Sequence, residues 1–305
     1  MRLTARNWRA RAAEHAARAD AFTAGHRARR SRHEKHAVED FLYEYYPFKP
    51  GKARRWHPGV GVELLPDDDA HPADAHPAGE GAESVADLDE RSAWRWHRRT
   101  EDGGVTLDVP AFVADRGDGV RWVDQLLRRT AGRAPTLGCF GWHEWAMVYR
   151  QERHRHPLPL RLGQAATDAA VESATIRCSH FDAYRFFTPD AEPLNTLTPT
   201  RERQIELDQP GCLHVNMDLL RWCLTLGPAV PGELLLDCAD LALDVRRLDM
   251  AAAPYDVSGY GLAPVRIEEP AGRAEYARRQ KEMAVRAAPL RERLIEVTSA
   301  LLADE

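Results

Sequence analysis

The chain has 305 residues, 44% of them hydrophobic and 29% charged, with a formal net charge of −5 at pH 7. This length and composition indicate a folded protein with a full hydrophobic core. The sequence contains neither an apolar run of about 18 residues, as a membrane span needs, nor the apolar block of a secretory signal near its start. We therefore expect a soluble, cytoplasmic protein.

The N-terminal region is strongly basic. Residues 1–36 hold ten Lys or Arg and three Asp or Glu, a local surplus of +7, so the remainder carries −12. Residues 5–30 are rich in Ala and Arg and predict a helix with few apolar side chains. We predict a basic arm or helix over residues 1–32. Such an arm could contact nucleic acid, or it could simply be solvated.

Residues 33–305 are predicted to form a single helical catalytic domain. Its first element is an amphipathic helix from His33 that Pro47 ends. An acidic, Pro-rich stretch at about residues 64–88 predicts a disordered insertion. The run His57-Pro58-Gly59-Val60-Gly61 is similar to the hairpin of helix-hairpin-helix DNA binders, but this acidic stretch follows it and would repel phosphate.

Helical periods dominate the rest of the domain. Residues 175–182 alternate and predict a strand, whereas residues 272–303 predict a closing helix that Pro289 interrupts. The predicted fold class is therefore mainly α: a multi-helix single domain with a few short strands. The cysteines never form a C-x-x-C pair, which fits reduced core thiols. They are Cys139, Cys178, Cys212, Cys223 and Cys238.

The most apolar helix of the chain is predicted over residues 211–226. Apolar side chains cover most of its circumference, yet it also carries His214, Asp218 and Arg221. Burying an ionised Asp or Arg costs several kcal/mol unless the group is paired or bound to a metal. A reactive site would explain these three residues.

Two further apolar segments carry the same combination of residue types. His143 and Glu144 lie among tryptophans, and His180 and Asp182 share one face of the predicted strand. If the three pairs converge, they supply the imidazole and carboxylate groups of an Fe, Mn or Zn site. Alternatively, each pair is only a local hydrogen-bonded core pair. The predicted metal ligands are His143, Glu144, His180, Asp182, His214 and Asp218.

The leading hypothesis is a metal-dependent enzyme, an oxidoreductase or hydrolase, with a small-molecule substrate and with non-haem iron as one candidate metal. Arg221 or Arg177 would bind an anionic group of that substrate. Nucleotide-binding glycine motifs, a P-loop and a GxSxG elbow are all absent from the sequence, which argues against dinucleotide, NTP and serine hydrolase chemistry. The predicted catalytic residues are Glu144, Asp182, Arg221 and Tyr184. A non-enzymatic ligand-binding protein, whose polar pairs only fix its core, is another alternative.

The chain also resembles a family of mainly actinobacterial proteins designated 3-methyladenine DNA glycosylases. The resemblance covers most of the chain except the acidic insertion, and it implies hydrolysis of the N-glycosidic bond of an alkylated purine after the base is flipped into an aromatic pocket. In that case Trp142, Trp145, Tyr149 or Tyr184 would stack on the base, and Glu144 or Asp182 would stabilise the oxocarbenium charge. The segments that carry the resemblance are residues 36–46, 55–59, 143–150, 178–189, 209–218 and 248–256.

Overall fold

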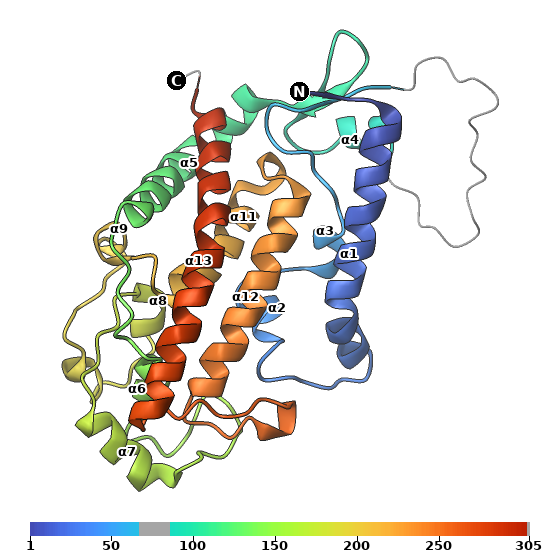
Figure 1. The fold of residues 1–305 in the computed structure, drawn as a ribbon. Helices are drawn as coiled ribbons and strands as arrows, with labels where there is room; N and C mark the ends of the chain where they lie inside the picture. Colours follow the sequence, from blue (N-terminus) through green and yellow to red (C-terminus); the bar gives the residue numbers. More distant parts are fainter. Residues whose placement is uncertain (67–85, 304–305) are drawn as a thin grey trace.

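The computed structural model describes residues 1–66 and 86–303, and it confirms a mainly α fold with a few short strands (Figure 1). None of the helices in these two ranges is long and apolar enough to cross a membrane. The longer helices are α1 (Ala5–Ser31), α5 (Val109–Ala131), α7 (Gly163–Ser173), α11 (Leu219–Leu226), α12 (Gly232–Ala252) and α13 (Pro270–Leu301). The short helices are α2 (Phe41–Tyr45), α3 (Pro50–Ala53), α4 (Leu88–Ser92), α6 (Trp142–Ala146), α8 (Phe181–Tyr184), α9 (Gln204–Leu207) and α10 (Leu213–Met217).

Helix α12 is the centre of the fold. It lies between α13 on one side and α1 on the other, and α10 and α11 also pack against it (Figure 1). Leu241, Val245 and Leu248 on this helix are fully buried. Because it is covered on several sides, polar side chains on α12 have to find partners inside the protein.

A small sheet connects the N-terminus to the body. Its strands are ordered β1-β2-β4-β3, with β1 parallel to β2 and the other pairs antiparallel. Leu64 is the register partner of both Leu3 and Val105. The strands are β1 (Arg2–Leu3), β2 (Glu63–Leu64), β3 (His97–Arg99) and β4 (Val105–Leu107).

The basic N-terminal segment forms α1, and much of its positive charge is used within the protein. Arg11 lies 2.8 Å from Glu233, and Arg18 lies 2.9 Å from Asp237 and 2.6 Å from Asp240. These three acidic residues are on α12. The ion pairs attach the predicted arm to the central helix and reduce the charge that it could offer to a nucleic acid.

Residues 67–85 of the predicted acidic insertion lie outside the described residues. The predicted bounds of the insertion, residues 64 and 88, are too wide at both ends. Leu64 is buried in β2, and the Asp87 side chain caps α4 by accepting from the Glu90 amide at 2.8 Å. The hairpin-like run before the insertion packs inward. Gly59 has a φ of +92°, and a Cβ atom there would lie 2.7 Å from Pro231 Cγ at the start of α12.

Three predicted elements differ in the structure. The helix predicted from His33 is reduced to α2: His33 has a φ of +56°, and the Asp40 side chain accepts from the His36 amide at 2.8 Å, so that residues 37–40 form turns before α2 begins. Residues 175–182 do not form a strand: the Asn195 side chain accepts from the Cys178 amide at 2.7 Å and donates to its carbonyl at 2.9 Å, taking the place of a neighbouring strand. Helix α13 continues through Pro289 without interruption.

Candidate functional site

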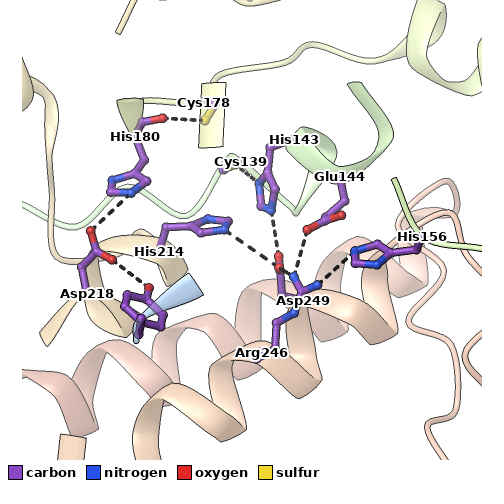
Figure 2. Close-up of polar contacts among 11 residues, drawn as sticks. Cys139, His143, Glu144, His156, Cys178, His180, His214, Asp218, Arg246 and Asp249 are labelled. Carbon is purple, nitrogen blue, oxygen red and sulfur yellow. Dashed lines mark hydrogen bonds and ion pairs between the residues drawn. The ribbon is translucent and has the colours of Figure 1, made fainter. Parts of the chain in front are cut away.

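The predicted site residues come from four short or interrupted helical segments that meet beside α12. Helix α6 carries His143 and Glu144, and α10 carries His214. The predicted helix over residues 211–226 is divided at Asp218, where α10 ends and α11 begins. His180 precedes α8 as its N-cap residue. Figure 2 shows these side chains pointing toward one another.

One part of the site is a set of buried charges that we call the α12 network: His143, Glu144, Arg246 and Asp249. His143 Nε2 lies 2.7 Å from Asp249 Oδ1. Arg246 Nη1 donates to Asp249 Oδ2 at 2.9 Å and to Glu144 Oε1 at 3.0 Å. Both oxygens of Asp249 are therefore bound by cationic or potentially cationic side chains of the protein.

The charges of the α12 network shift one another's pKa values. Burial alone would lower the pKa of His143, but the Asp249 carboxylate outweighs burial and raises it well above the usual range. Burial alone would raise the pKa of Asp249, but His143 outweighs it and lowers the value. Burial and the nearby Asp249 raise the pKa of Glu144. The network thus stabilises an ion pair and leaves Glu144 able to hold a proton more readily than a free carboxylate.

The second part of the site, which we call the α8 triad, is His180, Asp182 and Asp218. Each residue offers one potential ligand atom, and these atoms lie within 4.8 Å of one another. His180 Nε2 lies 3.6 Å from Asp218 Oδ2. The other ring nitrogen, Nδ1, lies 3.1 Å from Asp208 Oδ1. A carboxylate bound at Nδ1 fixes the imidazole so that Nε2 faces the triad.

The two carboxylates of the α8 triad have unequal surroundings. Tyr46 donates to Asp218 Oδ1 at 2.7 Å, but Asp218 Oδ2 is buried and accepts no hydrogen bond from residues 1–66 or 86–303. Asp182 is held between two guanidinium groups, with Oδ2 2.9 Å from Arg221 Nη2 and Oδ1 2.9 Å from Arg185 Nε. Burial raises the pKa of Asp218, whereas Arg221 outweighs burial at Asp182 and lowers its pKa.

His214 connects the two parts. Its ring stacks on His180 at a centroid distance of 5.5 Å and meets His143 edge-on at 4.5 Å. Its Nε2 atom lies 4.0 Å from Asp249 Oδ2, and Figure 2 shows it between the α8 triad and the α12 network. Burial and the adjacent His143 lower the pKa of His214 well below the usual range. His214 is therefore a neutral imidazole with no charge of its own to compensate.

In the part of the chain that the structure describes, two sets of three side chains could hold a metal ion: the α8 triad, and His143, His214 and Asp249. In the second set, a metal ion at Asp249 would compete with both His143 and the Arg246 guanidinium. In the α8 triad, Arg221 and Arg185 also compete for Asp182, but among the described residues Asp218 Oδ2 accepts no hydrogen bond. Asp208 orients His180 as outer carboxylates orient metal-bound histidines. The α8 triad is therefore the better fit for a divalent cation.

The structure brings all three predicted His/carboxylate pairs into one region, but with different partners. His143 pairs with Asp249 rather than Glu144, and Glu144 pairs with Arg246. Arg221 reaches the α8 triad. Two other predicted residues do not join the site by hydrogen bond or ion pair within the described ranges: the Tyr184 ring packs on Phe187 at 5.0 Å, and Arg177 is exposed.

Four residues of the site were not predicted: Tyr46, Asp208, Arg246 and Asp249. Arg246 and Asp249 stand three residues apart on α12, with Arg247 between them and Asp244 just before them. Because Asp244 and Arg247 are only half-buried, charge on this helix did not identify the Arg246–Asp249 pair as buried. Tyr46 and Asp208 carry no comparable signal, because their contacts depend on the tertiary fold.

The aromatic residues that the glycosylase hypothesis requires are largely in the core. Trp142, Trp145 and Tyr149 are buried. Trp145 Nε1 donates to the Ala252 carbonyl at 2.9 Å, and Tyr149 donates to Glu172 at 2.9 Å. Trp145 and Tyr149 are thus held by hydrogen bonds within the protein, whereas Trp142 also lines a cavity of about 610 Å³.

Comparison with known proteins found no matching family model, no matching curated protein and no matching solved structure.

Proposed function

We propose that this protein is a metal-dependent enzyme that acts on a small molecule, with the metal ion held by His180, Asp182 and Asp218. The observation that carries the proposal is the buried Asp218 Oδ2 atom, which accepts no hydrogen bond from any described residue and lies 3.6 Å from His180 Nε2. Leaving a buried acceptor without a partner costs about 1–3 kcal/mol, and more for a charged group. A divalent cation between these atoms would remove that cost.

The donor set suits Fe, Mn or Zn, since each of these metals binds imidazole and carboxylate together. A bound ion would polarise a substrate oxygen or lower the pKa of a bound water. Arg221 has a side-chain exposure of 28% and lies 3.3 Å from Asp218 Oδ1. It contacts both carboxylates of the triad and reaches solvent, so we assign it the role of binding an anionic group of the substrate.

The α12 network would act beside the metal rather than on it. Its Arg246–Asp249 ion pair lies next to His214. Glu144, whose pKa is raised by burial, is the group in this network best suited to hold or donate a proton. The predicted ligands His143 and Glu144 thus become positioning and proton-holding groups in this proposal.

The test is elemental analysis of untagged protein purified without chelators, with folding checked by circular dichroism. We expect about one Fe, Mn or Zn per chain in the wild type and little in His180→Ala or Asp218→Asn. Asp218→Asn preserves the shape of the side chain while removing its charge. His154→Ala is the matched control, because His154 is a half-buried histidine that bonds Gln164 outside the site; it should retain the metal.

Three results are informative against the assignment. Metal retained in both triad variants, but lost in His143→Ala, would move the ion to His143, His214 and Asp249. Metal retained in all of these variants would place it elsewhere. A wild type that neither contains nor takes up metal would refute the proposal, and excision assays on alkylated DNA would then test the activity that the family resemblance implies.

A further inference from the structure

A second concave site lies at the opposite end of α12. A cavity of about 400 Å³ is lined by residues of α3, by residues 94–97 and by the junction of α11 and α12. Gly232 and Leu235 of α12 contribute to its wall, whereas Asp249 belongs to the site described above. At about 1.5 Å per residue the two places are roughly 20 Å apart. The volume is within the usual range for small-molecule sites, about 300–1,000 Å³.

The cavity is positively charged. Lys49, Lys52 and Arg55 line it, and none of the lining residues within 1–66 and 86–303 is acidic. Within residues 1–66 and 86–303 these three side chains form no ion pair, although the neighbouring Arg54 is paired with Asp20 at 2.9 Å. Like charges gathered in one concavity repel one another. A bound anion would relieve this repulsion.

A buried guanidinium group next to the cavity wall adds to the positive potential of the cavity. Arg91 is only 2% exposed, and the hydrogen bonds found for it in the described chain go to the carbonyls of Trp56 and Ala86, at 3.0 and 2.8 Å. Its guanidinium lies 4.9 Å from the ring of Trp94, which lines the cavity. Burial lowers the pKa of Arg91 to about 10, so it remains charged at neutral pH. A fixed positive charge thus stands behind Trp94.

The same cavity has an aromatic wall. The ring of Trp94 lies 5.2 Å from that of His57 and 5.7 Å from that of His97, and the Arg55 guanidinium lies 4.6 Å from its centroid. His57 Nδ1 is buried and has no hydrogen-bond partner in the described part of the chain. Planar groups pack well against aromatic rings such as these.

We propose that this cavity binds a small molecule in which a planar aromatic ring is joined to a phosphate. The phosphate would contact Lys49, Lys52 and Arg55, and the ring would lie against Trp94 and His57. Guanidinium and ammonium groups bind phosphate through charge-assisted hydrogen bonds. A free inorganic anion would satisfy the cations but leave the aromatic wall and most of the cavity unused, which is why both features are needed in one ligand.

The experiment is isothermal titration calorimetry at low ionic strength with AMP as the probe, beside adenosine and inorganic phosphate. We expect AMP to bind with a Kd below about 1 mM and at least about tenfold more tightly than either fragment. The double variant Lys49→Gln/Lys52→Gln should weaken AMP binding about tenfold or more. The control Lys35→Gln/Lys281→Gln removes the same charge from exposed positions outside the cavity and should bind as the wild type does.

Trp94→Leu separates the roles of ring and charge. It should abolish the advantage of AMP over inorganic phosphate while leaving phosphate binding in place. The proposal is overturned if AMP does not bind, if the two double variants lose affinity equally, or if a single-stranded oligonucleotide binds and AMP does not. His180→Ala should still bind AMP, because the two sites are far apart, so a failure here is distinct from a failure of the metal proposal.

Discussion

Arg246 offers the sharpest test of how the buried charges are balanced. The side chain is 2% exposed, and it donates to both Glu144 and Asp249. Arg246→Met keeps most of the apolar volume but leaves two buried carboxylates with less positive charge. Removing one partner of a buried ion pair costs about 3–5 kcal/mol. With an unfolding entropy of about 2.1 cal/mol/K per residue, roughly 0.6 kcal/mol/K for this chain, we expect Tm to fall by about 5–8 °C.

Arg18→Met is the matched control for this measurement. Arg18 also contacts two carboxylates of α12, Asp237 and Asp240, but its side chain is 39% exposed. Such a pair contributes at most about 1 kcal/mol, so Tm should fall by less than about 2 °C. Differential scanning calorimetry on both variants decides the matter. Equal shifts for the two variants would refute the view that Arg246 holds the α12 network together.

Three further predictions concern the metal, the packing of α12 and pH. A metal ion present at 100 times its Kd stabilises the folded protein by about 2.7 kcal/mol, so a chelator should lower the wild-type Tm by about 4 °C. The chelator should leave the Tm of His180→Ala unchanged. Gly232→Ala should lower the free energy of unfolding in urea by about 1–3 kcal/mol, because the new Cβ would lie 2.7 Å from Trp56 Cδ1. Gly119→Ala, in the interior of α5, meets open space and should raise the free energy of unfolding by about 0.5–1 kcal/mol. Burial lowers the pKa of His57 from 6.5 to about 3, so the unfolded chain binds a proton at His57 at a higher pH than the folded protein does. The contribution of neutral His57 to the free energy of unfolding is therefore complete above about pH 6.5 and is lost as the pH falls toward 3, with a slope of up to about 1.4 kcal/mol per pH unit. His57→Gln should remove this slope from the pH dependence of stability.

The long helices could be predicted because their signals are local. The helices predicted over residues 5–30 and 272–303 correspond to α1 and α13, and the dominance of helical periods predicted the mainly α fold class. The short elements depend on contacts between distant residues. Asn195 replaces a strand partner for Cys178, and nothing in the alternation of residues 175–182 reveals that. The interior proline was also misleading, since α13 continues through Pro289.

The sequence predicted which His and carboxylate residues could meet, but not which of them pair with one another. Buried charge on apolar segments correctly pointed to one shared region, which the ring contacts of His214 with His143 and His180 now join. Sequence neighbours were taken as partners, yet Asp249 binds His143 from 106 residues away. Which carboxylate faces which imidazole depends on how α6 and α10 are placed against α12, and this is a property of the assembled core.

The placement of α10 shows why a helix far from the chemistry matters to it. Helices of five residues are not stable alone, so α10 must be held by its surroundings. Helix α13 supplies two buried contacts: Gln280 donates to the Gly211 carbonyl at 2.6 Å, and Arg291 donates to Asn216 at 2.6 Å. These bonds fix the segment on either side of His214. Helix α13 therefore keeps His214 between the α8 triad and the α12 network. The buried cations on α12 and α13 act differently: Arg246 balances the charge of the buried carboxylates, whereas Arg291 holds α10, which carries His214, in place.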